Sequence, residues 1–144
     1  MQKAADILAR KGATIISITP QTTVLDAIKL MSEKNIGSVV VMDGDTFVGI
    51  MTERDYTRKV ILKGKSSTHT MVSEIMSVDF PNISPSDSIE KCMELMASNN
   101  IRYLPVFGNE GLSGIISMQD VVKQTILKQE ETISQLKDYL HASM

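Results

Sequence analysis

The chain carries an internal duplication, and this feature limits the folds open to it more than any other. When the sequence is shifted by 65 positions, residues 18–55 align with residues 83–120 without a gap, and ten of the 38 aligned pairs are identical. Typical residue frequencies of roughly 5–7% would give about two identical pairs by chance. The identical pairs are Ile18/Ile83, Pro20/Pro85, Leu30/Leu95, Met31/Met96, Asn35/Asn100, Ile36/Ile101, Val41/Val106, Gly49/Gly114, Ile50/Ile115 and Asp55/Asp120. The chain is therefore expected to fold as two copies of one unit.

Both copies predict the same order of elements, β-α-β-β-α, which places the chain in the α/β (α+β) class. In the first copy the predicted strands are residues 14–19, 36–42 and 47–51, and the helices begin at Thr23 and Thr52. In the second copy the strands are residues 78–83, 101–107 and 112–116, and the helices begin at Asp87 and Ser117. One such unit is too small to bury its own sheet, so we expect the two copies to pack together.

Two further helices are predicted outside the repeats, a short one over residues 4–11 and a long one from Met118 to about His141. The resulting boundaries are 7–64 for the first repeat, 65–73 for a polar linker and 74–141 for the second repeat. The long helix carries a stripe at 3–4 spacing: Val122, Ile126, Ile133, Leu136 and Leu140, interrupted once by Gln129. Such a stripe is expected to dock on a neighbouring subunit or on the surface of the module itself.

Composition excludes several classes of protein. The net charge of −2 and the isoelectric point near 5.7 give no basic field for nucleic acid. The longest apolar run, residues 39–42, is far shorter than the roughly 20 residues of a membrane span. One cysteine and two histidines cannot supply a tetrahedral zinc site, so no metal is expected. The first residues lack the features of a secretory signal, and a soluble, cytoplasmic protein is expected.

Two segments could carry chemistry, Gly49–Asp55 and Gly114–Asp120. Each places a hydroxyl and a carboxylate three residues apart at the start of a predicted helix, as Thr52 with Asp55 and as Ser117 with Asp120. One interpretation is a capping box, which stabilises the helix end by itself. The other is a nucleotide cradle, in which the helix N-terminus and the hydroxyl bind phosphate and the Asp accepts both hydroxyls of a ribose. The pattern fits both.

Other polar residues also allow two interpretations. Lys11 and Gly12 are typical of a helix end, and they would equally suit a ligand. Arg102 interrupts an apolar strand and needs an anion, either an acidic side chain or a phosphate. Cys92 lies on an apolar stripe and is expected to be a core thiol. Because nucleophile–base pairs and clustered ligands are missing from the pattern, no catalytic residues and no enzymatic activity are predicted.

The duplication and these segments resemble a known family. The pattern Gly-apolar-apolar-Thr/Ser-x-x-Asp occurs twice, and residues 36–41 and 101–106 add the segments Ile-Gly-Ser-Val-Val-Val and Ile-Arg-Tyr-Leu-Pro-Val. Together they look like tandem cystathionine-β-synthase (CBS) domains over nearly all of residues 7–141, and they are similar to the stand-alone CBS-pair proteins of bacteria and plant organelles. The resemblance implies two repeats packed with pseudo-twofold symmetry, called a Bateman module, with two clefts for adenosine-containing ligands.

The resemblance also implies composite binding sites. In the Asp120 cleft, Ser117, Gln119 and Asp120 would hold ribose and phosphate, and Arg102 and Tyr103 would lie near phosphate. The same cleft would take Lys11, Gly12, Thr14 and Ile16 around the base, with Gly37 alongside. In the Asp55 cleft, the residues would be Thr52, Arg54, Asp55 and Ser38, with Val78 and Phe80 near the base. We expect the Asp120 cleft to be the better-formed site.

Two residues depart from the family pattern: Tyr103 stands where a histidine is common, and Gln119 where a small residue is common. The resemblance implies a non-catalytic regulatory module that binds an adenosine-containing nucleotide, with AMP expected first and ATP, ADP or NAD(H) as other ligands. We expect the module to form a homodimer and to act on an unidentified regulated protein. The alternative is a protein–protein interaction module with no physiological nucleotide.

Overall fold

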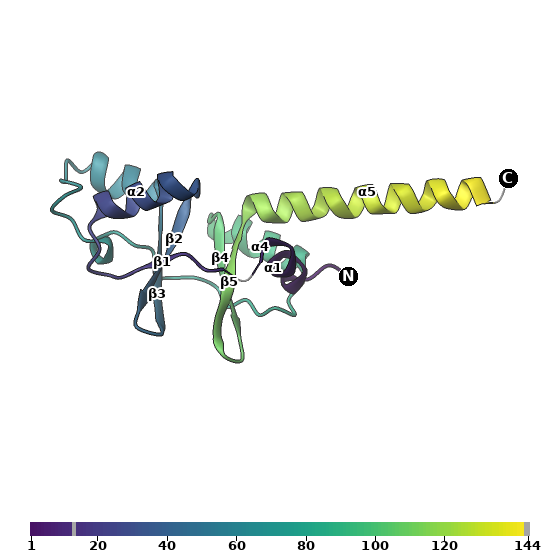
Figure 1. Ribbon diagram of the computed structural model, residues 1–144, viewed down its shortest axis with the longest axis horizontal. Helices are drawn as coiled ribbons and strands as arrows, with labels where there is room; N and C mark the ends of the chain where they lie inside the picture. The colour runs from purple at the N-terminus through teal and green to yellow at the C-terminus, as the bar shows by residue number, and fades with distance from the viewer. Residues whose placement is uncertain (13, 143–144) are drawn as a thin grey trace. The chain divides into compact units, whose positions relative to one another are not determined.

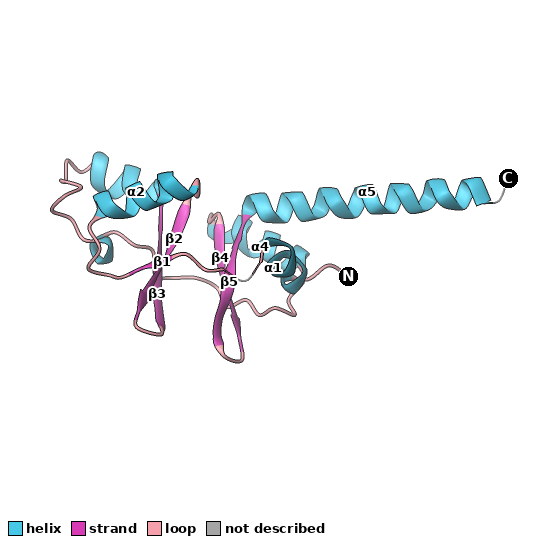
Figure 2. Ribbon diagram, in the orientation of Figure 1, coloured by secondary structure: helices cyan, strands magenta, loops and turns pink. Residues whose placement is uncertain are grey.

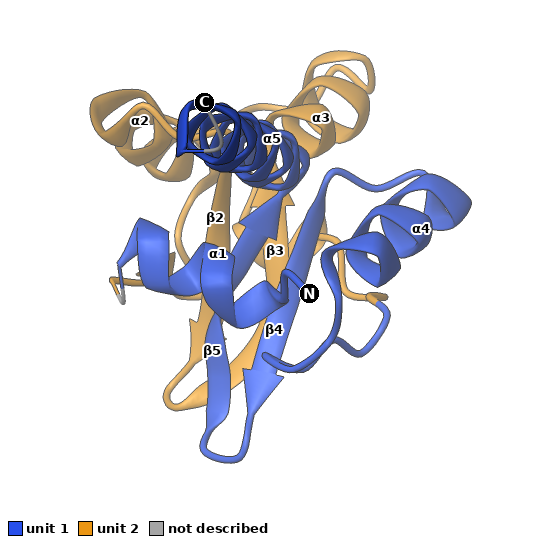
Figure 3. Ribbon diagram, turned by 90° about the vertical axis from the view of Figure 1, so that its right-hand side faces the viewer, with its two compact units in different colours: residues 1–13, 81–144 blue, residues 14–80 orange. Residues whose placement is uncertain are grey.

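The computed structural model describes residues 1–12 and 14–142. The chain divides into two compact units, unit 1 from residues 1–13 and 81–144 and unit 2 from residues 14–80 (Figure 3). Each unit combines helices with a small sheet (Figure 2). This confirms the predicted fold class, a mixed α/β chain built from two copies of one repeat with an added N-terminal helix and a long C-terminal helix.

Unit 2 is built on a three-stranded sheet in the order β1-β2-β3 (Figure 1). Its elements are β1 (Ser17–Ile18), α2 (Val24–Lys34), β2 (Ser38–Asp43), β3 (Thr46–Thr52), α3 (Glu53–Tyr56), η1 (Thr57–Ile61) and η2 (Val72–Glu74). β1 runs parallel to β2, and β2 runs antiparallel to β3. The core of unit 2 consists of buried apolar residues from these elements: Val24, Ala27, Met31, Val39, Val41, Met51, Val60, Val72 and Ile75.

Unit 1 repeats this plan around an antiparallel pair of strands. Its elements are α1 (Ala4–Lys11), α4 (Ile89–Asn99), β4 (Tyr103–Gly108), β5 (Gly111–Ser117) and α5 (Met118–Ala142). The predicted strand over residues 78–83 is reduced to a single parallel bridge between Ile83 and Val106. Pro81 and Pro85 flank this bridge, and a proline has no N–H with which to extend a ladder. The core consists of Ala4, Ile7, Ile83, Ile89, Cys92, Met96, Leu104, Val106, Ile116 and Val121.

The two long repeat helices begin and end alike. Thr23 caps α2 by accepting a hydrogen bond from the Asp26 N–H, and Ser88 caps α4 in the same way for Lys91. The predicted cap at Asp87 is therefore one residue too early, because Asp87 instead accepts a hydrogen bond from the Ser84 N–H. Both helices end at an asparagine in the left-handed conformation, Asn35 and Asn100.

One glycine in each unit allows another segment to lie directly on its last strand. A Cβ atom added at Gly114 of β5 would lie 2.7 Å from Leu8 of α1, and one added at Gly49 of β3 would lie 2.8 Å from the Ser77 carbonyl oxygen. The helix α1 thus packs on the strand of the second copy, within unit 1. The predicted boundary at residue 7 places residues 7–12 with the first repeat, whereas the structure includes them in unit 1.

Of the helices in the described residues, none combines the length and the apolar character that crossing a bilayer requires.

Candidate functional site

Both Thr/Ser-x-x-Asp segments form capping boxes at helix starts. In unit 2, Asp55 Oδ2 accepts a hydrogen bond from the Thr52 N–H at 3.0 Å, and the Thr52 hydroxyl accepts one from the Asp55 N–H at 3.0 Å. In unit 1, Asp120 Oδ2 accepts from the Ser117 N–H at 2.8 Å, and the Ser117 hydroxyl accepts from the Asp120 N–H at 3.1 Å. The capping interpretation is correct for both copies, so any nucleotide role must rest on other features.

Those features differ between the two carboxylates, beginning with Asp55. Its Oδ2 also accepts from the Thr52 hydroxyl at 3.0 Å. Its Oδ1 accepts from the Ser77 hydroxyl at 2.9 Å and forms an ion pair with Lys59 at 2.9 Å. The Asp55 side chain is only 8% exposed. A carboxylate has about four acceptor positions, so donors within unit 2 occupy all of those of Asp55.

The Asp120 carboxylate uses only one of its two oxygens in hydrogen bonds within the described residues. Lys11 Nζ lies 2.8 Å from Asp120 Oδ2 and also donates to the Ile115 carbonyl oxygen at 2.8 Å. Within the described residues, the side-chain hydrogen bonds of Asp120 all go to Oδ2, and Oδ1 accepts none. The side chain is 17% exposed, so water or a ligand can reach it. Asp120 thus keeps an oxygen available for a donor from outside the chain.

The electrostatic setting keeps Asp120 ionised. Burial alone would raise the pKa of this carboxyl, but hydrogen bonds from the Lys11 ammonium and the Ser117 backbone outweigh burial and hold the pKa below its usual value. An ionised carboxylate makes the stronger, charge-assisted hydrogen bonds with hydroxyl donors.

A pocket of about 430 Å³ opens within unit 1, and Ser117, the capping partner of Asp120, is among its lining residues. It lies where α4 ends, β4 begins, and β5 passes into α5. Its lining consists of Met96, Ala97, Asn100, Ile101, Arg102, Tyr103, Ser117, Met118 and Gln119. The volume falls within the range of roughly 300–1,000 Å³ found for small-molecule sites. Four predicted site residues, Arg102, Tyr103, Ser117 and Gln119, are brought together here.

Arg102 is the cation of this pocket. Arg102 is exposed, and its backbone carbonyl oxygen accepts a hydrogen bond from the Met118 N–H at 2.8 Å. This bond holds the start of α5 against the start of β4. In the described part of unit 1 the ion pairs are Lys11–Asp120 and Lys91–Asp87, so Arg102 has no acidic partner there. The sequence left two kinds of anion open for Arg102, and the described residues of its own unit do not supply the acidic side chain.

The remaining predicted residues occupy the following places. Gly12 ends α1 with a φ of 93°, and the side chain of its neighbour Lys11 forms an ion pair with Asp120.

Within unit 2, Thr14 is exposed. The carbonyl oxygen of Ile16 accepts a hydrogen bond from the Val40 N–H, and the carbonyl oxygen of Gly37 accepts one from the Glu53 N–H. Ser38 and Thr52 are paired across β2 and β3. Arg54 is half-buried, and Val78 is exposed. The ring of Phe80 contacts the ring of Phe47, with the two centroids 6.4 Å apart.

Two partners of Asp55 were missed by the sequence analysis, Lys59 and Ser77. Lys59 lies four residues after Asp55, a spacing that places both side chains on one face of a helix and that could have indicated the pair. Ser77 aligns with Gly12 at the repeat offset, so the serine supplies in unit 2 a donor that the glycine cannot supply in unit 1.

Comparisons with known proteins agree with this duplicated architecture. The model of the CBS domain family matches the chain twice, over residues 4–61 and 72–126. The CBS domain-containing protein CBSX3, mitochondrial, of Arabidopsis thaliana is 34% identical over 94% of this chain and 70% of its own length. The CBS domain-containing protein YhcV of Bacillus subtilis is 31% identical over 84% of each chain. A solved structure with CBS domains from Burkholderia ambifaria MC40-6 aligns with a TM-score of 0.84 and 46% identity, over 89% of this chain and 96% of that one.

Proposed function

This chain belongs to the CBS-domain family, and from that premise we propose that it is a non-catalytic regulatory module whose unit 1 binds an adenosine nucleotide. Two observations carry the proposal. Asp120 keeps an available oxygen, and its capping partner Ser117 lines a pocket whose arginine has no acidic partner among the described residues of unit 1. A ligand with a hydroxylated sugar and a phosphate satisfies both groups at once.

The sugar is assigned to Asp120. A ribose carries neighbouring hydroxyl donors, and Asp120 Oδ1 accepts one of them in a charge-assisted hydrogen bond. Lys11 holds the opposite oxygen at 2.8 Å and so fixes the direction in which Oδ1 points. The lowered pKa of Asp120 keeps the acceptor ionised at neutral pH.

The phosphate is assigned to the Arg102 end of the pocket. Arg102 offers a planar set of donors that suits phosphate oxygens. Met118 and Gln119, in the first turn of the 25-residue helix α5, line the same pocket. The positive end of the helix dipole therefore adds to the positive potential of Arg102 there. The two sources of positive potential together favour an anion here.

The proposal places the principal site in unit 1 and not at Asp55. Every acceptor position of the Asp55 carboxylate is used by a donor of unit 2, so a ribose would have to displace an internal bond. The Asp55 cleft, with its residues in unit 2, stays a prediction from the family resemblance, as do Thr14, Ile16 and Gly37 around the base of the first ligand.

Regulation follows from where the ligand binds. The pocket includes the first two residues of α5, so ligand binding restricts the start of the helix that extends furthest from the sheet. A ligand shifts such an equilibrium only by its difference in affinity for the two arrangements. The protein that responds and the cytoplasmic location stay predictions, since the relatives include a mitochondrial protein.

Isothermal titration calorimetry with AMP, ADP, ATP and NADH tests the proposal. We expect saturable binding of at least one of them, and a loss of affinity of tenfold or more in Asp120→Ala, since hydrogen bonds to charged groups contribute about 1.5–3 kcal/mol. Asp87→Ala is the matched control, because Asp87 is a paired carboxylate whose partners, Lys91 and Ser84, do not line the pocket. Wild-type binding by Asp120→Ala, or no binding of any of the four nucleotides, would overturn the proposal.

A further inference from the structure

The distal part of α5, residues 126–142, buries no side chain within the part of the chain that the structure describes. Every residue from Ile126 to Ala142 is exposed, and Val121 is the buried residue of this helix among those described. Isolated helices shorter than about 12–15 residues are marginal in water, and most helical stability in proteins comes from packing of an apolar face. The second match of the family model ends at residue 126, so this part of α5 lies outside the repeat that the model describes.

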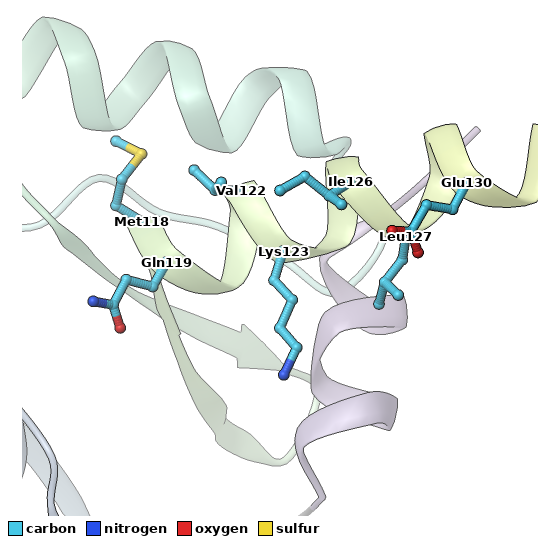
Figure 4. Close-up of a pocket in the computed structure, with 7 residues that line it drawn as sticks. All are labelled: Met118, Gln119, Val122, Lys123, Ile126, Leu127 and Glu130. Carbon is cyan, nitrogen blue, oxygen red and sulfur yellow. The ribbon is translucent and has the colours of Figure 1, made fainter.

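The exposed face is apolar and regular. Val122, Ile126, Ile133 and Leu136 are 48–58% exposed, and with Gln129 they follow the alternating 4- and 3-residue spacing of a coiled-coil seam. Figure 4 shows Val122 and Ile126 projecting from the same side of α5. Both line a groove of about 420 Å³ along the first turns of the helix, with Lys123 and Glu130 among its other residues.

We propose that this seam, Val122, Ile126, Gln129, Ile133 and Leu136, pairs with the same seam of a second copy of the chain in a parallel, in-register, two-stranded coiled coil. The proposal concerns a different surface from the nucleotide pocket and goes beyond the proposed function.

Gln129 identifies the partner as a second copy. In the parallel, in-register arrangement each seam residue faces its own counterpart, so Gln129 meets Gln129 of the partner subunit, and the two amides can donate to and accept from each other. An unrelated apolar partner would leave the amide without a hydrogen bond, which costs about 1–3 kcal/mol. Single polar residues at core positions are known to set register and number of strands in coiled coils.

The charges that flank the seam are compatible with the parallel orientation, which Gln129 favours. Lys123, Glu130 and Lys137 occupy one flanking row, and Thr125 and Thr132 belong to the other. In a parallel pair, one row meets the opposite row, so Glu130 meets Thr125 of the partner subunit and no like charges meet.

An antiparallel pair in which the overlap runs from residue 122 to residue 140 is disfavoured by the same residues. It would place Gln129 against Ile133 of the partner subunit, Glu130 against Glu130 of the partner subunit, and Lys123 against Lys137 of the partner subunit. The polar side chain would then face an apolar one, and every flanking contact between these charged residues would be repulsive.

Disulfide trapping in the full chain distinguishes the arrangements. Gln129→Cys and Ile133→Cys are each oxidised with oxidised glutathione, and Gln135→Cys serves as a matched control because it lies on the same helix outside the seam. The natural cysteine adds little background, because Cys92 is buried and burial raises the pKa of its thiol. We expect at least a fivefold excess of cross-linked dimer for the two seam variants over Gln135→Cys.

Three outcomes would overturn the proposal. Equal cross-linking at positions 129, 133 and 135 would show random collision, and no cross-linking at the seam positions would show that they do not meet. Cross-linking that appears only when Gln129→Cys and Ile133→Cys chains are mixed would show an antiparallel pair. All substituted positions are exposed, so the circular dichroism of the variants is expected to match the wild type.

Discussion

Lys11 and Asp120 form an ion pair of 2.8 Å that joins the end of α1 to the first turn of α5. The corresponding pair in unit 2, Lys59 and Asp55, is 2.9 Å long and lies within a single helical stretch. The two copies have therefore kept the acidic residue and changed the origin of its cation. In unit 1 this change leaves Asp120 Oδ1 open, because the position aligned with Lys59 is Gln124, which binds Arg10 and Gln2 instead.

The first prediction concerns the pH dependence of the Lys11–Asp120 pair. Because the pKa of Asp120 is lowered in the folded state, ionisation of this carboxylate adds stability above the ordinary Asp value of 3.8, and this contribution is lost as the pH falls through the folded pKa. Asp120→Asn is therefore expected to cost about 1–2 kcal/mol of unfolding free energy at pH 7 and less at pH 3. Urea unfolding of both proteins at the two pH values measures the difference, and an equal cost at both would contradict it.

The second prediction compares two lysines that each pair with an aspartate four residues earlier. Lys59→Met removes a cation from Asp55, which is 8% exposed, and removes the hydrogen bond to the Ile75 carbonyl oxygen. Leaving a nearly buried carboxylate without one of its partners is destabilising, so we expect the free energy of unfolding to fall by about 1–3 kcal/mol. Lys91→Met is the control, because Asp87 is more exposed and the pair should contribute less than about 1 kcal/mol. Thermal and urea unfolding give both values, and an equal loss would refute the assignment.

The third prediction distinguishes the two close glycines. The Cβ of Gly49→Ala would meet the Ser77 backbone oxygen at 2.8 Å, which cannot move without shifting the chain. The Cβ of Gly114→Ala would meet the end of the Leu8 side chain at 2.7 Å, which can change rotamer. We expect Gly49→Ala to cost about 1–3 kcal/mol and Gly114→Ala clearly less. Unfolding free energies from urea titration test the order, and the reverse order would contradict it.

Much of this architecture could be predicted from the sequence because the duplication allowed each element to be identified twice. Thr23 and Ser88 show the benefit of the repeat, since the offset of 65 predicts the cap at Ser88 that local inspection placed at Asp87. Local patterns could not predict the packing of α1 on β5, because the contact between Leu8 and Gly114 joins residues more than one hundred positions apart. The family resemblance alone placed Lys11, at the end of α1, near Asp120. The spacing Thr/Ser-x-x-Asp also could not show which of the two carboxylates has all its acceptor positions occupied. One donor to Asp55 is Ser77, which lies 22 residues away in the sequence.

The last prediction concerns the polar residue of the α5 seam. A glutamine at a core position lowers the stability of a coiled coil in return for a fixed register, so Gln129→Leu is expected to strengthen association of the full chain by about tenfold or more. Gln135→Leu makes the same substitution outside the seam and is expected to leave the association constant unchanged. Sedimentation equilibrium measures both constants. If both variants strengthened association equally, general hydrophobicity would explain the result, and if Gln129→Leu weakened it, Gln129 would not lie in a paired core layer.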